Sequence, residues 1–511
     1  MRILLVNQSN GVAFNQNPPL GILYLAASLK KAGHETFVYD QGAQENKLEY
    51  PSAEMIKALS PDIVGFSLYT FGLPQTLQYI KELKRDFPGI KVVLGGHHAT
   101  AVPERTMHDC AEAEALVYGE GDVTIVELAD AIEKGEGLSG VAGVYYRENG
   151  SVLHTGPRAY LDSLDTLPFP ANELIQGYTY PSESIGPGNK VLNLTSARGC
   201  PFRCAYCNKA VYGSSFRRRG VKNVVDEIEY MFEKFGYDEV MFHDELFTAN
   251  RTWVYELLGE FEARGLSFPW RCLGRVGTVD YELLASMRKG GCYLISFGLE
   301  SGNDRVRRDI NRVMSNDDIK NTFDIAKKAG IITYAFNMIN HRLDTVDTIR
   351  DTYELMCRVN PTFAPVFVCS PLPGSPIYQY VSDDIKYNWE RYNSYRYFGG
   401  LPISISSVPA EELMFLADQM EAFFYSRFSY LTGHVLGLKA GMKIKKMTAM
   451  LWSGFLLLRL KHIAQDKYFV TARGFSGFGV LTAKACYGII RGALLLGRGL
   501  PLFQKALKKL T

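Results

Sequence analysis

The chain lacks a long uncharged apolar run. Although 47% of its 511 residues are hydrophobic, no stretch of about 18 or more uncharged apolar residues occurs, and a membrane-spanning helix needs such a stretch. Residues 1–6, MRILLV, read as a strand and are too short for a signal peptide. The nine cysteines are an odd number, which argues against a disulfide framework. We therefore predict a protein of the reducing cytoplasm without a transmembrane helix.

Acidic residues are almost missing from the end of the chain. Residues 431–511 contain 14 Lys and Arg but only Asp466 as an acid, a net charge of +13, so residues 1–430 carry −11 of the total +2. The apolar runs 450–459, 488–497 and 500–510 carry interspersed cations, a pattern typical of helices in a membrane interface. We predict a helical, cationic region over 401–511 with peripheral contact to the inner membrane face. A helical cap with a solvated basic side is the alternative, and no recognition module supports nucleic-acid binding.

The first 140 residues alternate strand-like and helical patterns, which predicts a doubly wound parallel sheet with helices on both faces. Strands are expected at 3–6, 36–39, 63–68, 92–94 and 115–117, and helices at 21–31, 53–59, 76–87 and 123–132. Such sheets bind ligands beyond the carboxyl ends of their strands. The G-x-G-x-x-G fingerprint after the first strand is absent, so this Rossmann-like domain is not predicted to bind a dinucleotide.

Residues 141–190 are predicted to connect two domains. A small hairpin is expected around Asn149-Gly150, a strong turn pair, and a proline-rich passage follows it. Strand–helix units then resume over 191–400, with about six strands, which fits a partial (β/α) barrel. The expected strands are 192–195, 239–242, 270–273, 293–298, 332–337 and 365–369, and the expected helices 223–234, 253–264, 281–289, 317–329 and 345–359.

Three cysteines stand within eight residues after the first of these strands. Cys200, Cys204 and Cys207 form the pattern C-x-x-x-C-x-x-C, with no fourth cysteine or histidine nearby. Thiolates bind soft metals and iron–sulfur clusters, and three of them would leave one corner of a four-iron cluster open. A structural zinc ion, which usually has four ligands, is the alternative.

This loop resembles a known signature. The spacing C-x-x-x-C-x-aromatic-C, with Arg198-Gly199 before it, resembles that of the radical S-adenosylmethionine (SAM) enzymes, in which SAM chelates the open iron. The runs at 18–21, 93–100 and 118–121 resemble the cobalamin-binding domain that precedes many such barrels. The D-x-H-x-x-G box with its cobalt-ligating histidine is absent, so the resemblance implies a corrinoid held without a lower-face histidine. The whole order resembles cobalamin-binding radical SAM enzymes.

The resemblance also implies site residues. The segment 242–247 resembles the D-D-x-F segment that meets the SAM amino group, 298–302 resembles G-x-E-S-G, and 311–312 resembles an N-K/R step. The implied SAM contacts are Tyr206, Asp244, Arg275, Glu300, Ser301 and Arg312. The implied cobalamin contacts are Asn10, Ser67, Tyr69, Gly95, Gly96, His97, Thr100, Gly119 and Glu120.

In function, the resemblance implies a 4Fe-4S cluster, SAM and cobalamin as cofactors, and C-methylation of an apolar or lipid-like substrate. An external electron donor such as a flavodoxin or ferredoxin would reduce the cluster. An oxidative cyclase of the anaerobic porphyrin-ring type shares this layout and is the second hypothesis. A non-catalytic regulator that binds corrinoid or zinc is the third.

Overall fold

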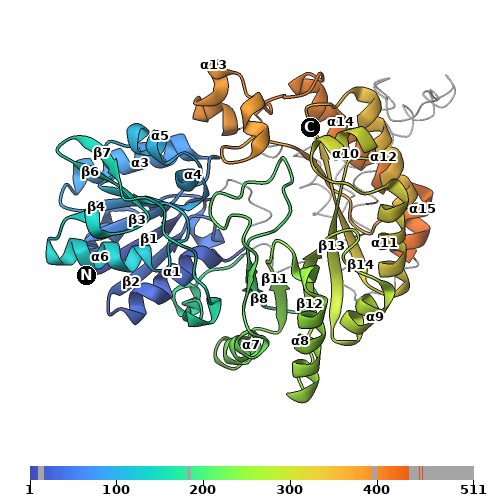
Figure 1. Cartoon of the computed structure of the whole chain (residues 1–511), viewed down its shortest axis with the longest axis horizontal. Helices are drawn as coiled ribbons and strands as arrows, with labels where there is room; N and C mark the ends of the chain where they lie inside the picture. The colour runs from blue at the N-terminus through green and yellow to red at the C-terminus, as the bar shows by residue number, and fades with distance from the viewer. Residues whose placement is uncertain (10–16, 181–185, 394–399, 437–447, 449–451, 453–511) are drawn as a thin grey trace, which may run out of the picture.

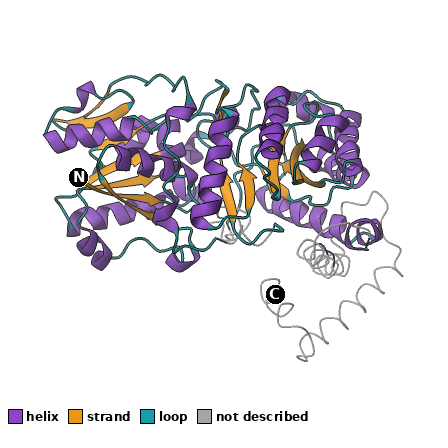
Figure 2. Cartoon of the chain, turned by 90° about the horizontal axis from the view of Figure 1, so that it is seen from below, coloured by secondary structure: helices purple, strands orange, loops and turns teal. Residues whose placement is uncertain are grey.

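The computed structural model describes residues 1–9, 17–180, 186–393 and 400–436, together with Thr448 and Trp452. Two large sheets lie side by side along the long axis of the molecule, each with its own helices (Figure 1; Figure 2). The first sheet has seven strands and the second has six. The predicted α/β class is therefore confirmed.

The first sheet has the order β2-β1-β3-β4-β5-β6-β7. Its strands are β1 (Arg2–Asn7), β2 (Glu35–Asp40), β3 (Ile63–Ser67), β4 (Lys91–Gly95), β5 (Ala115–Val117), β6 (Val144–Glu148) and β7 (Ser151–His154). The first five pair in parallel. Because the chain leaves β1 for β2 on one side and then passes to β3 on the other, a switch point lies between β1 and β3. Ligand crevices form at the carboxyl ends of strands at such points.

The last two strands correct the expectation of a wholly parallel sheet. β6 and β7 pair antiparallel to their neighbours, so the predicted hairpin extends the first sheet. Asn149 and Gly150 both have positive φ, 49° and 81°, as a tight two-residue hairpin turn requires. The hairpin joins the sheet because Val144 and Tyr146, two residues apart, are both buried in the core that also contains Ile3 and Leu5 of β1.

Six helices cover the two faces of this sheet: α1 (Leu20–Lys31), α2 (Ala53–Leu59), α3 (Leu73–Asp86), α4 (Gly96–Ala101), α5 (Pro103–Asp109) and α6 (Thr124–Lys134). Successive side chains of a strand point to opposite faces. Ile3 and Leu5 accordingly pack in one core, and Leu4 and Val6 in the other. The short helices α4 and α5 were not predicted. They lie between β4 and β5, where the sequence indicated no helix.

The second sheet is parallel throughout, in the order β8-β11-β12-β13-β14-β15. Its strands are β8 (Val191–Leu194), β11 (Glu239–Phe242), β12 (Trp270–Gly274), β13 (Cys292–Glu300), β14 (Ile332–Ile339) and β15 (Val366–Val368). Strand order follows chain order, and β8 and β15 form the two edges of this six-stranded sheet, each paired with one neighbour only. This confirms the predicted partial barrel.

Helices cover the outer side of the partial barrel, in agreement with the predicted strand–helix units. They are α7 (Val221–Phe235), α8 (Arg251–Ala263), α9 (Tyr281–Lys289), α10 (Asp304–Asp309), α11 (Asn316–Lys328), α12 (Val346–Val359) and α14 (Ala410–Tyr425). Ser315 and Thr345 begin α11 and α12 with capping boxes, which satisfy amide groups that have no partner inside a helix.

One segment of the barrel region returns to the first domain. It contains the 3-10 helices η7 (Pro376–Tyr380) and η8 (Trp389–Asn393) with α13 (Asp383–Lys386) between them, and it lies at the top of Figure 1. Val381, Trp389, Tyr392 and Ile403 are buried in the core formed by β1, β3 and α3. The first domain is therefore completed by residues far along the chain.

The chain after α14 is described through α15 (Phe428–Tyr430) and the π-helix η9 (Leu431–Leu436). Within the described residues, every helix is too short or too polar to cross a membrane. The apolar segments predicted at 450–459, 488–497 and 500–510 lie outside the described residues.

Candidate active site

The three clustered cysteines lie on a loop that leaves the strand β9 (Ala197–Arg198). Cys204 is buried, Cys200 and Cys207 are half-buried, and all three are free thiols. The loop is pinned to the barrel, because the Ala205 amide donates to the carbonyl of Ile310 at 3.1 Å. Burial, and then the neighbouring Cys204, raises the pKa of the Cys207 thiol to about 11. A metal must therefore displace a tightly held proton there.

The sulfur atoms of the three cysteines do not all lie within 4.8 Å of one another. Zinc ligands lie about 2.3 Å from the ion, so the sulfurs of one site must be near one another. Among the described residues, the only three metal-binding side chains with ligand atoms within 4.8 Å of one another are His34, Asp130 and Glu133, on the first domain. Cys200, Cys204 and Cys207 do not form such a group.

Four of the predicted SAM contacts gather around Cys204. The Tyr206 hydroxyl donates to Glu300 Oε1 at 2.7 Å, and Arg312 Nη2 donates to the same oxygen at 2.9 Å. Arg275 Nη1 lies 3.7 Å from Cys204 Sγ. Burial, and then Glu300, raises the pKa of the Tyr206 hydroxyl. The cluster loop, the end of β13 and the segment after α10 thus meet at one place.

Backbone geometry allows this gathering. Glu300 has φ 64°, and the pairing of β13 with β14 shifts register between Gly298 and Glu300. A Cβ at Gly298 would lie 2.0 Å from Glu300 Oε1 and 2.3 Å from Arg312 Nη2. Glycine is therefore required there because the carboxylate and the guanidinium lie directly over the backbone.

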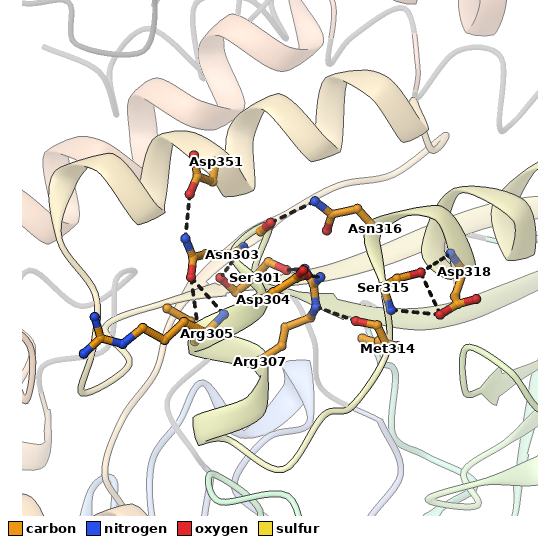
Figure 3. A network of polar contacts seen from close by, with 12 residues as sticks. Ser301, Asn303, Asp304, Arg305, Arg307, Met314, Ser315, Asn316, Asp318 and Asp351 are labelled. Atoms are coloured by element: carbon orange, nitrogen blue, oxygen red, sulfur yellow. Dashed lines mark hydrogen bonds and ion pairs between the residues drawn. The ribbon is translucent and has the colours of Figure 1, made fainter.

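Ser301 does not join this group. Its hydroxyl lies 3.3 Å from Thr352 Oγ1 and accepts from the Asn303 amide at 3.2 Å. Figure 3 shows it within a network that holds the start of α10, where Asn303 donates to Asp351 of α12 at 2.8 Å. The contacts of Ser301 connect α10 to α12.

Asp244 is also turned away from the open space of the site. It is fully buried and accepts from the amides of Ser196 and Ala197 at 2.6 and 3.1 Å. Burial raises the pKa of its carboxyl, although these hydrogen bonds oppose the rise. Its neighbours His243 and Glu245 line the cavity instead. Glu245 is therefore the acid of the segment 242–247 that lines the cavity, whereas Asp244 faces the backbone of residues 196 and 197. The contact between Asp244 and SAM stays a prediction.

A cavity of about 490 Å³ lies between the two sheets. The predicted cobalamin contacts that line it are Ser67, Tyr69, Gly95, Gly96, His97, Gly119 and Glu120. From the barrel side it is lined by Thr195, Arg198, Val211, Tyr212, His243 and Glu245. The cavity stands at the carboxyl ends of the strands, beside the switch point, where such sheets bind ligands.

Two predicted contacts stand outside this lining. Thr100 lies behind the wall, where its hydroxyl accepts from the Gly119 amide at 3.2 Å. Asn10 lies outside the described residues.

Burial shifts the pKa values of three groups that line the cavity, His97, His243 and Glu245. Burial lowers the pKa of His97, whose ring stacks on Tyr69 at 5.9 Å. Burial, and then the charge of Arg271, lowers the pKa of His243 to about 4. Burial raises the pKa of the Glu245 carboxyl to about 6. At neutral pH both imidazoles are therefore neutral, as suits a large ligand with extended apolar faces.

The cavity walls fit a bulky group. Gly119 lines the cavity with φ 78°, and a Cβ added there would have no neighbour within 4 Å, so the added atom would occupy ligand space.

Sequence reasoning missed Asp122, Arg198, Arg217 and Glu245. The signal for Glu245 was its place beside Asp244. The pairing of residues 120 and 122 with 198 and 217 had no signal in the sequence.

Two family models match the chain. The B12 binding domain matches residues 10–129, and the Radical SAM superfamily matches residues 194–356. The first match covers the sheet that forms one wall of the cavity, and the second covers the cysteine loop and most of the barrel.

Several proteins are similar over most of their length. An uncharacterized methyltransferase of Pyrococcus horikoshii is 29% identical over 403 residues, which cover 77% of this chain and 86% of the relative. The anaerobic magnesium-protoporphyrin IX monomethyl ester cyclase of Rubrivivax gelatinosus is 29% identical over 408 residues, 77% of this chain and 72% of the cyclase. The hopanoid C-3 methylase of Methylococcus capsulatus is 24% identical over 372 residues, 70% and 67% of the two chains.

Two solved structures share the fold. The radical SAM methyltransferase TsrM from Kitasatospora setae, solved with cobalamin and a [4Fe-4S] cluster, has a TM-score of 0.61 at 18% identity, over 73% of this chain and 76% of its own. The cobalamin-dependent SAM radical enzyme OxsB has a TM-score of 0.66 at 16% identity, over 97% and 80%. The sheet domain and the partial barrel thus recur together in the same order.

Proposed function

Since the chain belongs to the cobalamin-binding radical SAM enzymes, we propose that it is a methyltransferase that acts on an unactivated carbon of an apolar or lipid-like small molecule. The expected cofactors, a 4Fe-4S cluster, SAM and cobalamin, are those of this family. The observation that carries the proposal is a single cavity that reaches from the strand ends of the first sheet, at Gly95 and Gly119, to His243 and Glu245 of the barrel.

When bound, the cluster and SAM supply a 5′-deoxyadenosyl radical that removes a hydrogen atom from carbon, and cobalamin supplies the methyl group. Cys200, Cys204 and Cys207 would ligate three irons and leave the fourth for SAM. Tyr206 and Arg312 hold one oxygen of Glu300, so its other oxygen can accept from a ribose hydroxyl in a fixed orientation.

The corrinoid would lie in the cavity against the glycines at the strand ends. Gly96 and Gly119 let the backbone approach a flat ring closely, because neither carries a side chain. The stacked rings of Tyr69 and His97 offer an apolar surface at the same wall. Relatives described as methyltransferases support transfer of a methyl group, and the hopanoid methylase among them supports an apolar substrate.

Anaerobic reconstitution tests the proposal. With a chemical reductant, the loaded protein should convert SAM to 5′-deoxyadenosine. Lipid extracts from cells with the gene should contain species heavier by one CH₂ group than extracts without it. Replacing Cys200, Cys204 and Cys207 by Ala should abolish iron loading and SAM cleavage but leave cobalamin bound. Cys357→Ala, on α12 outside the cysteine loop, is the control.

The results separate the hypotheses. SAM cleavage that persists in the triple variant would refute the cluster assignment. An unmodified protein that forms no deoxyadenosine would be a regulator instead of an enzyme.

A cyclase is the second candidate. Anaerobic magnesium-protoporphyrin IX monomethyl ester cyclases from three organisms are 26–29% identical to this chain. A cyclase forms deoxyadenosine as well, but its product does not gain a CH₂ group. Product mass with a porphyrin monomethyl ester as substrate therefore separates the two reactions.

Two partners belong to this proposal. The cluster needs an external one-electron donor, for which we propose a flavodoxin or ferredoxin. The 14 cations of residues 431–511 would bind an anionic membrane surface and bring the site close to a lipid-like substrate. We propose a cytoplasmic enzyme at the inner membrane face.

Co-sedimentation with phosphatidylglycerol vesicles tests the membrane contact. The chain ended after Trp452 keeps Thr448, whose hydroxyl donates to the His434 carbonyl at 3.4 Å, and Trp452, which packs against the barrel core. It still removes ten of the 14 cations. The full chain should pellet with the vesicles and the shortened chain should not. Equal pelleting of both would refute the contact.

A further inference from the structure

A short antiparallel ladder stands directly before the cysteine loop. Its strands, β9 and β10 (Arg217–Arg218), place Arg198 opposite Arg217. Residues 217–219 are three consecutive arginines, and such a charge run is usually a solvated surface. Here the side chains of Arg198, Arg217 and Arg218 are only 5%, 11% and 8% exposed. Buried charges are costly unless they are paired.

Arg198 and Arg217 pair with two acids of the first domain. Arg198 donates to both carboxylate oxygens of Asp122, at 2.6 and 3.1 Å, and to Glu120 Oε1 at 3.2 Å. Arg217 donates to both oxygens of Glu120, each at 2.8 Å. Two guanidinium groups thus balance two carboxylates. Paired N–H donors to one carboxylate fix direction as well as distance.

The same stretch of chain is held from the barrel side. Asp244 accepts from the amides of Ser196 and Ala197, the residues just before Arg198. Gly199 follows with φ 83° and leads directly into Cys200. The four residues before the first cluster cysteine are therefore fixed between acids of both domains.

Three members of this network also line the cavity. Glu120, Asp122 and Arg198 face the same space as Gly119 and His97. A large ligand there would exclude water from these charges and contact their side chains. If the carboxylates moved and Arg198 did not, buried charges would be left without a partner, which is costly. The positions of the two acids and of Arg198 therefore change together.

We propose that Arg198 is a positioning residue that couples occupancy of the cobalamin cavity to the geometry of the cluster loop. The inference rests on the proposed function only in taking cobalamin as the ligand of the cavity. Cobalamin seated beside Asp122 and Glu120 orders their carboxylates, Arg198 follows them, and the backbone carries the restraint through Gly199 to Cys200. Cobalamin in the cavity would thereby restrain the loop that holds the cluster more tightly than the ion pairs do alone.

A neighbouring pair provides the control. Arg219 pairs with Glu227, their side chains 5% and 0% exposed, and Arg219 Nη1 contacts the Tyr24 hydroxyl of the first domain at 3.2 Å. This pair also joins the two domains and is equally buried, but neither residue lines the cavity. Asp122→Asn and Glu227→Gln each remove one buried carboxylate and keep its shape. A network that only holds the domains together predicts the same effect for both.

The test measures hydrogen exchange in the full chain with its cluster loaded, with and without hydroxocobalamin. In the unmodified protein and in Glu227→Gln, cobalamin should slow exchange of the amides of residues 195–204 by about fivefold or more, the lower end of usual coupling between sites. In Asp122→Asn the slowing should fall below about twofold, although visible spectra show bound cobalamin. Arg198→Lys keeps the charge but loses the paired donors and should behave like Asp122→Asn.

A second readout follows the cluster itself. The electron paramagnetic resonance spectrum of the reduced cluster should change on cobalamin addition in the unmodified protein and in Glu227→Gln, but not in Arg198→Lys. Equal protection in all variants, or equal loss in Asp122→Asn and Glu227→Gln, would overturn the coupling and leave the proposed function intact. An unmodified protein that does not bind cobalamin would overturn both, and a failed search for a methylated product would overturn only the proposed function.

Discussion

The carboxyl group of Glu245 lies in the cavity, where burial restricts its contact with water. The side chain lies between the two domains with His243 and Tyr212. Burial is the largest cause that raises the pKa of this carboxyl from 4.5 to about 6, and Asp244 adds to the rise. Burial therefore keeps the acid neutral up to about pH 6, and a cationic ligand beside it would favour the carboxylate.

This shift predicts a pH dependence of stability. Because the folded pKa is raised, the contribution of Glu245 to the free energy of unfolding is fully present below about pH 4.5 and is lost as the pH rises through about 6. At pH 8, Glu245→Gln should therefore raise the free energy of unfolding by about 2 kcal/mol, so this variant should unfold at a higher temperature than the unmodified protein. This gain should disappear at pH 4.5. Thermal unfolding of the cofactor-free proteins across this range measures it. A gain that is independent of pH would contradict the assignment, and Glu256→Gln, exposed on α8, is the control.

Single residues were predictable where a local pattern specifies chemistry. Cys200, Cys204 and Cys207 stand in a spacing that few other sites use, and Glu300 follows a glycine that its carboxylate overlies. Asp244 and Glu245 differ in no local property, since both are acids at a strand end. Which of them lines the cavity depends on the amides of Ser196 and Ala197, which lie 48 and 47 positions earlier in the chain.

Among the secondary-structure elements, the β9–β10 ladder depends on one glycine. Gly199 has φ 83°, and a Cβ there would lie 2.1 Å from the carbonyl oxygen of Ser215. Gly277 has almost the same φ, 84°, but a Cβ there would meet nothing within 4 Å. The two positions therefore separate backbone strain from steric clash.

Gly199→Ala should disrupt the cluster loop, whereas Gly277→Ala should not. Both substitutions carry the cost of a left-handed backbone conformation, about 1–2 kcal/mol. Only Gly199→Ala must also displace the backbone of Ser215, and with it the ladder before Cys200. We expect iron and sulfide content to fall severely in Gly199→Ala and to stay near the unmodified level in Gly277→Ala. Equal iron content in the two variants would show that the ladder is not needed for cluster assembly.

Most elements followed from periodicity, because a strand or helix that buries one face must repeat its apolar residues. The exceptions were short. Helices α4 and α5 have six and seven residues, too few to establish a helical period. The hairpin β6–β7 was expected, but its attachment to the first sheet depends on the core that receives Val144 and Tyr146.

Across the whole molecule, the first domain is completed by the segment that contains α13. The ring of Trp389 lies 4.7 Å from that of His98, edge to face, and its Nε1 donates to Asp109 at 2.7 Å. His98 follows Gly96 and His97 of the cavity wall. The barrel half of the chain thus supports the cavity wall from behind.

Trp389→Ala should weaken the first domain although residue 389 lies far beyond it in sequence. Loss of a buried Trp costs about 3–5 kcal/mol, so we expect a lower unfolding temperature and weaker cobalamin binding in a spectral titration. Tyr380→Ala is the control, because Tyr380 lies on the same segment, is 45% exposed and has the Arg342 guanidinium over its ring, an interaction of about 0.5–1 kcal/mol. Unchanged cobalamin affinity in Trp389→Ala would show that this support does not reach the cavity.

The sequence by itself determined the two-sheet α/β architecture, the cysteine loop and the class of cofactors, because each is written in residues close together in the chain. Periodicity reports which face of an element is buried, and ligand spacing reports the metal chemistry. Only the tertiary structure decided which acid lines the cavity, that the arginine run is buried, and that Val381, Trp389, Tyr392 and Ile403 complete the core of the first domain. These depend on contacts between residues that are tens to hundreds of positions apart, such as Arg198 with Asp122. Their energy comes from desolvation and pairing at the place where two elements meet, and no local pattern encodes that place.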